Sequence, residues 1–222
     1  MDFLNLLVEA WRFILEHPAR FGQALATHIT LSLASLATAC AIAIPLGVIL
    51  ADRNRGALFA INIANIGRTL PSLAVLALVM PIMGTGFAPS WFALTLLALP
   101  PILINTYTAV REVDADAVDA ARGMGMGAGQ IIGKIKLPLA LPVLFAGVRT
   151  AAVQVVSGAV LAAYIGGGGL GDFITAGIAM MAVPQLLVGA IPATLLSLGT
   201  DFLFGRIQHW LTPEGIQTKA AA

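Results

Sequence analysis

Five apolar stretches, each long enough to cross a bilayer, constrain this chain more than any other feature. A helix of about 20 apolar residues covers the hydrocarbon core of a membrane. Segments of that kind are predicted at 28–50, 57–83, 88–110, 141–164 and 184–204. Only 10% of the residues are charged, whereas soluble domains carry about 25%. The sequence therefore predicts an all-α membrane protein with about five transmembrane helices.

The stretch before the first span is too short to cross. Its apolar residues recur at helical spacing, which favours a helix lying in the membrane interface; they are Phe3, Leu6, Leu7, Trp11, Ile14 and Leu15. The first residues include acids and lack the basic start of a signal peptide. We expect an interfacial helix over 1–20, a transmembrane domain over 21–210 and a short cytoplasmic tail over 211–222.

The positions of Lys and Arg predict the orientation, since cytoplasmic loops carry an excess of both. With five spans, the two chain ends lie on opposite sides. Connections on one side carry only Arg12 and Arg20. Those on the other carry Arg53, Arg55, Arg111, Arg122, Lys134, Lys136, Arg206 and Lys219. We expect a multi-pass protein of the plasma (bacterial inner) membrane, with the N-terminus outside and the C-terminus in the cytoplasm.

The connection at 112–138 is charged and glycine-rich, and it falls on the predicted cytoplasmic side. Asp114, Asp116 and Asp119 precede or open a short helical run through Met124. Asp116 and Asp119 have the spacing of a capping box, and acids suit the positive end of a helix. The sequence therefore predicts a short helix held across the membrane surface.

Small residues follow the acids in this connection. Ala120 and Ala121 present almost no side chain, so a partner surface could approach the helix closely. The glycines at 123, 125, 127 and 129 oppose its continuation. A second helical run is predicted from about Gln130 into the fourth span.

Residues 119–138, DAARGMGMGAGQIIGKIKLP, closely resemble the cytoplasmic loop of permease subunits of ATP-binding-cassette (ABC) importers. The signature there is Glu-Ala-Ala, three residues, Gly, nine residues, then Ile-x-Leu-Pro, and Asp119 replaces the Glu. The resemblance implies a type I ABC importer permease fold with a coupling helix that docks on an ATPase; a plain amphipathic connector is the alternative. The implied coupling residues are Asp119, Ala120, Ala121, Gly123, Met124, Gly125, Ile135, Leu137 and Pro138.

The resemblance extends over about residues 25–205. Segments such as RTLPSLAVLALVMPIMGTGFAP and LPPILINTYTAVREVD are similar to the osmoprotectant branch, which imports glycine betaine, choline, carnitine or proline-like solutes. Methionine or another amino acid is the alternative solute. The implied partners are a second permease copy or paralogue, an ATPase dimer, an external substrate-binding protein and the lipid bilayer, with no nucleic acid. The implied mechanism is alternating access.

The sequence predicts no catalytic site and no cofactor on this chain. The nearest candidate for a phosphate-binding loop, GAGQIIGKI, has Ala128 at the first glycine position and Ile135 at the hydroxyl position. ATP and Mg²⁺ are therefore expected on a partner chain. An ATP-independent secondary transporter is the alternative of another class, but it usually needs intramembrane carboxylates. Asp201 is the only acid predicted inside the membrane region.

Polar residues within the spans are the candidates for a translocation path, because such groups usually face protein or water. They are Arg68, Pro71, Asn105, Thr106, Tyr107, Gln154, Ser157 and Tyr164. Arg68 could line the path or extend to the cytoplasmic surface, and Pro71 would distort or start a helix. The cluster at 105–107 could form a gate or ordinary interhelical hydrogen bonds, below a kink or break at Pro100 and Pro101. The face at 154, 157 and 164 could be pore or dimer contact.

A glycine run, IGGGGLGDFI, follows the fourth span on the predicted outer side. Similar segments occur in amino-acid and betaine importer permeases, where the resemblance implies the outer mouth of the channel. The candidates are Gly167, Gly168, Gly169 and Gly171. A tight turn with only a packing role is the alternative.

Overall fold

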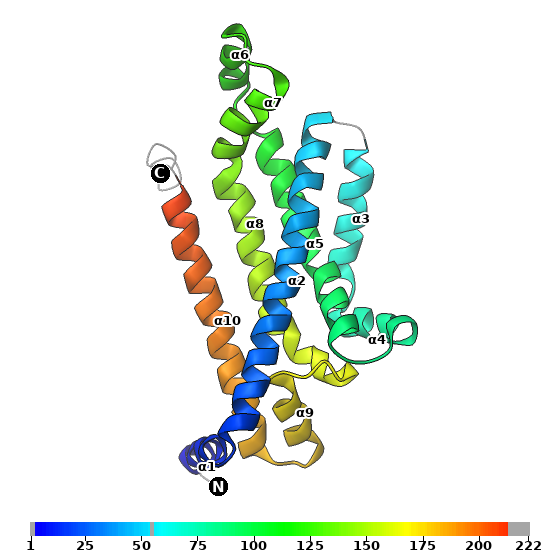
Figure 1. Cartoon of the computed structure of the whole chain (residues 1–222), viewed down its shortest axis with the longest axis vertical. Helices are drawn as coiled ribbons and strands as arrows, with labels where there is room; N and C mark the ends of the chain where they lie inside the picture. Colours follow the sequence, from blue (N-terminus) through cyan, green and yellow to red (C-terminus); the bar gives the residue numbers. More distant parts are fainter. Residues whose placement is uncertain (1–2, 54–55, 213–222) are drawn as a thin grey trace.

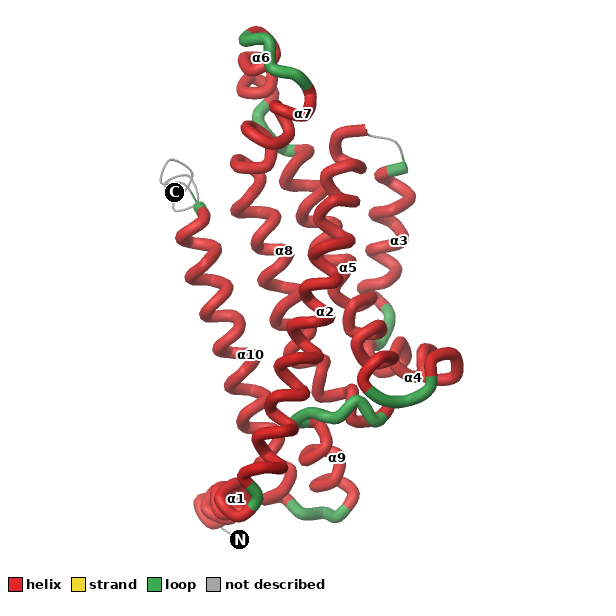
Figure 2. The backbone as a smooth tube through the Cα atoms, viewed as in Figure 1, coloured by secondary structure: helices red, strands yellow, loops and turns green. Residues whose placement is uncertain are grey.

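The computed structural model describes residues 3–53 and 56–212, and nearly all of these are helical (Figures 1 and 2). The α-helices in chain order are α1 (Phe3–Glu16), α2 (Pro18–Arg53), α3 (Ala57–Thr69), α4 (Ser72–Met83), α5 (Phe87–Arg111), α6 (Ala115–Gly123), α7 (Ala128–Ile131), α8 (Leu137–Gly158), α9 (Gly171–Ala179) and α10 (Val183–Leu211). A π-helical segment, Ile132–Lys136, joins α7 to α8, and a 3₁₀ segment, Ala159–Ile165, follows α8.

Four helical stretches of the described chain are long and apolar enough to cross a membrane, and the bent pair α3–α4 makes five if it counts as one span. The four are Pro18–Arg53, Phe87–Arg111, Ala128–Ile165 and Val183–Leu211. The third begins well before the predicted 141–164, because helix continues from α7 through the π segment. The predicted all-α membrane fold is confirmed.

The predicted second span, 57–83, is not one straight helix. α3 and α4 meet at an angle of 100°. Leu70 and Pro71, which separate them, are both extended, with ψ of 129° and 128°. The residue before a proline is disfavoured in helical backbone, so α3 stops and α4 starts anew at Ser72. The pair thus places a helix start inside the predicted membrane region.

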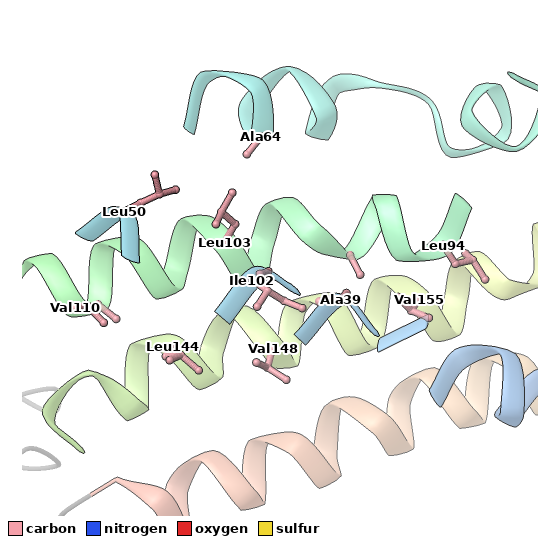
Figure 3. Packing of buried hydrophobic residues seen from close by; sticks show 14 of the residues in the cluster. Ala39, Leu50, Ala64, Leu94, Ile102, Leu103, Val110, Leu144, Val148 and Val155 are labelled. Carbon is pink, nitrogen blue, oxygen red and sulfur yellow. The ribbon is translucent and has the colours of Figure 1, made fainter. Parts of the chain in front are cut away.

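Helix α5 occupies the centre of the bundle and packs extensively against both α2 and α8. The core mixes branched aliphatic residues with alanines, as for Ala39 of α2, Ile102 of α5 and Val148 of α8 (Figure 3). Small residues let membrane helices approach closely. A Cβ added at Gly147 of α8 would lie 2.5 Å from the Asn105 Cβ of α5. These two helices are therefore in near backbone contact.

Pro100 and Pro101 do not break α5, although the sequence allowed a break there. Both lie buried inside the helix, which runs on to Arg111. Neighbouring helices can hold a membrane helix in place where proline removes a backbone hydrogen bond. Helices α2 and α8 provide such support on either side of α5.

The two ends of the bundle differ (Figure 1). Helices α6 and α7 extend beyond α5 and α8 at one end, whereas α1 and α9 lie at the other. Phe13 and Ile14 of α1 pack around Phe173 of α9. Five other apolar side chains of α1 are exposed, and the interfacial location of this helix stays a prediction; they are Phe3, Leu4, Val8, Trp11 and Leu15. The predicted boundary at residue 20 falls inside α2, and residues 213–222 of the predicted tail lie outside the described residues.

Candidate functional site

The short helix α6 is carried between the ends of α5 and α8 (Figure 1). Its start is capped by Asp114, whose Oδ1 accepts a hydrogen bond from the Asp116 N–H at 2.9 Å. The predicted capping box between Asp116 and Asp119 is wrong, because Asp116 already lies in the helix whereas Asp114 precedes it. Asp119 instead accepts a hydrogen bond from Arg122 Nη1 at 3.1 Å, in a pair that is exposed on both sides.

Ala120 and Ala121 do not share one surface. Ala121 is 0% exposed and packs with Val118 of α6 and Ile131 of α7, whereas Ala120 is exposed. Adjacent residues point about 100° apart on a helix of 3.6 residues per turn, so burying one leaves the next outside. The interpretation that both alanines face a partner is therefore corrected: only Ala120 is available for close approach.

A sharp turn ends α6. Gly125 has a φ of +79°, which disfavours any residue with a side chain. Its N–H donates to the Arg122 carbonyl at 2.9 Å. Gly123 and Met124 lie exposed just before it. Helix α7 then starts at Ala128, slightly before the predicted second helical run.

The π segment connects this turn to the membrane helix. Ile135 packs beneath α6, while Leu137 and Pro138 begin α8. Lys136 Nζ lies 3.5 Å from Asp52 Oδ1 near the end of α2. π-helical turns are rare and occur frequently at functional sites. The predicted coupling residues thus form one folded unit that is joined to α5, α8 and α2.

A second feature is a cavity of about 600 Å³ between the α3–α4 bend, α5 and the end of α8. Arg68, Gln154 and Ser157 line it together with apolar side chains. Pro71 lies beside it, between the lining residues Leu70 and Ser72. The structure therefore brings together residues from two predicted spans that were candidates for the translocation path.

The other path candidates lie elsewhere. Asn105 donates a hydrogen bond to the Pro101 carbonyl of its own helix, at 2.7 Å. Thr106 is fully buried, and Tyr107 packs half-buried against the main core. Tyr164 is 57% exposed and does not line the 600 Å³ cavity. The residues at 105–107 contribute helix packing, and their role in a gate stays a prediction.

The glycine run after the 3₁₀ segment is a tightly packed turn. Three of its glycines, at 166, 168 and 169, have positive φ angles of 72°, 76° and 93°. A Cβ at Gly167 would strike the Ser90 side chain, and a Cβ at Gly171 would strike the Val160 carbonyl. Packing and backbone conformation therefore favour glycine here, and the role of this turn as an outer mouth stays a prediction.

A small polar cleft of about 270 Å³ adjoins this turn. Gly168, Gly169, Arg20 and Asp172 are among its lining residues. Burial raises the pKa of the Asp172 carboxyl, and the positive charge of Arg20 partly opposes that change. The cleft places two of the outer-mouth candidates next to charged side chains.

An ion pair within the membrane region links α8 to α10. Arg149 Nε lies 2.7 Å from Asp201 Oδ1, and Arg149 Nη2 lies 2.8 Å from Oδ2. This bidentate arrangement is the strong form of an Arg–carboxylate contact. The sequence shows the acid but does not reveal its pairing, since the two residues are 52 positions apart. The sequence signal for this pair was that Arg149 and Asp201 are each the only charged residue in an apolar span.

Replacing Asp201 with Ala is expected to lower the thermal unfolding midpoint of the purified protein. The change leaves the Arg149 guanidinium without its acceptor in an apolar setting. The double variant Arg149→Met with Asp201→Leu removes both charges and should recover most of the lost stability. Thermal unfolding in lipid nanodiscs measures this, and equal losses in the single and double variants would contradict it.

The structure combines crossing helices, a folded unit carried by two of them and a polar cavity within the predicted membrane region. These features are typical of an integral membrane transport subunit. Comparison with known proteins gives the family. The family described as "binding-protein-dependent transport system inner membrane component" matches residues 43–214. The chain belongs to this family and is a permease subunit of an ABC importer.

Two curated relatives match this chain over most of their length. The chain is 39% identical over 213 residues to the carnitine transport permease protein OpuCB of Listeria monocytogenes, covering 96% of this chain and 91% of the relative. It is 40% identical over 190 residues to the choline transport system permease protein OpuBB of Bacillus subtilis, covering 86% and 88%.

Solved structures match in fold. A chain of the methionine ABC transporter MetNI in an inward-facing conformation superposes with a TM-score of 0.77 at 22% identity, covering 89% of this chain and 99% of that one. A chain of an amino-acid ABC transporter superposes with a TM-score of 0.68 at 16% identity, covering 95% and 97%. The expected type I importer permease fold is thereby confirmed.

Proposed function

We propose that this permease imports an osmoprotectant such as glycine betaine, choline, carnitine or proline by alternating access. The observation that carries the choice of solute is the similarity to permeases named for carnitine and choline, over 96% and 86% of this chain. The methionine transporter chain is similar in fold but only 22% identical in sequence, so methionine is the weaker candidate for the solute. A secondary transporter usually needs intramembrane carboxylates, and Asp201, the one acid in the predicted spans, is paired with Arg149.

The partners in this proposal are a second permease copy or paralogue, an ATPase dimer that holds ATP and Mg²⁺, and an external substrate-binding protein. The α6 unit supports an ATPase contact, because it combines an exposed face at Ala120 with its own small core. The excess of Lys and Arg at the α6 end supports a cytoplasmic location for that end. The N-terminus would then lie outside.

Reconstitution in liposomes with the partner ATPase and binding protein tests the proposal. Glycine betaine-loaded binding protein should stimulate ATP hydrolysis and drive uptake of the solute. Stimulation by another loaded solute alone would retain the importer mechanism and reject the osmoprotectant. Absence of any stimulation in a fully assembled complex would reject the proposed mechanism as a whole.

Replacing Ala120 with Arg is expected to reduce ATP hydrolysis to the unstimulated rate. The long side chain would project from the exposed face of α6 and hold the ATPase surface away, while the buried side at Ala121 stays unchanged. Ala120→Ser, which adds one small atom, is the matched control and should keep the stimulation. Equal stimulation in the Arg and Ser variants would show that this face does not dock.

A further inference from the structure

Arg68 is an unpaired cation in the cavity between the α3–α4 bend, α5 and α8. It is exposed into this cavity, and within residues 3–53 and 56–212 it makes neither a salt bridge nor a hydrogen bond. Arg149, the other arginine inside the spans predicted from the sequence, is paired with Asp201. A charge within a membrane protein is costly unless it meets water, a partner or a ligand. Arg68 therefore has donors available for an anion.

The start of α4 adds to the positive character of the same cavity. Ser72, the first residue of α4, lines it, and no side chain caps that helix. The first N–H groups of a helix and its dipole favour negative charge. The described residues lining the cavity include no Asp or Glu. The guanidinium of Arg68 and the start of α4 thus lie at the same cavity, because Pro71 breaks the span about one turn after Arg68.

The opposite wall offers uncharged groups. Gln154 and Ser157 supply polar atoms, and Leu97 and Leu161 supply apolar surface. The described lining residues include no aromatic side chain, and aromatic faces are what bind quaternary ammonium groups best. A volume of about 600 Å³ falls within the roughly 300–1,000 Å³ of small-molecule sites. The cavity therefore suits the anionic end of a small solute rather than its ammonium end.

We propose that Arg68 binds the carboxylate of the solute in transit, so that this cavity selects zwitterions that carry a carboxylate. The proposal rests on the proposed function and narrows its substrate class. Glycine betaine and choline share a trimethylammonium group, and only glycine betaine has a carboxylate. They form a matched pair of probes for this site.

The test measures equilibrium binding of radiolabelled glycine betaine and choline to the assembled permease–ATPase complex in nanodiscs, without binding protein. Wild type should bind glycine betaine roughly tenfold more tightly than choline, the factor expected for about one charge-assisted hydrogen bond. Arg68→Gln should remove that preference, and Arg68→Lys should keep part of it. Arg206→Gln removes an arginine on α10 outside this cavity and should bind as wild type does.

Three results would overturn the proposal: equal binding of the two probes by wild type, no binding of either, or a preference that survives in Arg68→Gln. If a carboxylate of a second permease copy were paired with Arg68, wild type would bind the two probes equally or bind neither. If Arg68→Gln does not assemble, binding of the methyl ester of glycine betaine to wild type is measured instead. This ester has no free carboxylate and should bind more weakly than glycine betaine.

Stimulation of ATP hydrolysis by loaded binding protein is measured in parallel. Its absence counts against the proposed function, whereas its presence without a carboxylate preference counts only against the role of Arg68.

Discussion

Replacing Gly147 with Ala is expected to destabilise the permease by about 1–3 kcal/mol, the usual cost of overpacking. The added Cβ would lie 2.5 Å from the Asn105 Cβ and 2.7 Å from the Pro101 carbonyl oxygen on α5. Neither atom is the free end of a flexible side chain, so α5 and α8 would have to separate. Thermal unfolding in nanodiscs, with yield of assembled protein as a second measure, quantifies the loss.

Gly199→Ala is the matched control for this variant. Gly199 also lies within a helix, α10, and a Cβ there meets nothing within 4 Å. Since alanine favours helix over glycine by about 1 kcal/mol, this variant should be as stable as wild type or more so. A Gly147→Ala protein as stable as the control would disprove the close packing of α5 on α8.

Replacing Gly125 with Val is expected to abolish uptake while leaving the membrane helices folded. The turn needs a φ of +79°, which costs about 1–2 kcal/mol for a residue with a Cβ and more for a β-branched one. The turn therefore rearranges, and α6 loses its position relative to α7. Solute uptake in liposomes measures the effect, and the thermal unfolding midpoint should stay near that of wild type.

Gly129→Val is the matched control, because it adds the same side chain at a glycine of ordinary backbone conformation. A Cβ meets nothing within 4 Å at either glycine, but Gly129 lacks the positive φ. It should therefore transport as wild type does. If Gly125→Val transports as well as Gly129→Val, the turn has no role in coupling.

The crossing helices were predictable because apolar length alone determines whether a segment suits a bilayer core. Pro71 gave a local signal for the start of α4, since the effect of proline on its neighbour needs no tertiary contact. The 100° angle of the bend was not predictable in this way, because α4 also packs against α5 and the 3₁₀ segment.

Features that depend on two distant segments escaped prediction. The burial of Ala121 requires Ile131 of α7 to fold back onto α6. The contact between Arg149 and Asp201 requires α8 and α10 to lie side by side. Arg68 was a candidate from its own segment, but the cavity it shares with Gln154 and Ser157 exists only once α3 and α8 face each other. Periodicity describes single helices and carries no information about such pairs.

The close packing at Gly147 has a mechanical consequence for α6. Helix α6 is carried between α5 and α8, and at this crossing no side chain separates the two helices at Gly147. We therefore expect a push on α6 to move α5 and α8 together. Because α10 is tied to α8 by the Arg149–Asp201 pair, the bend between α3 and α4 is the place where the bundle can yield.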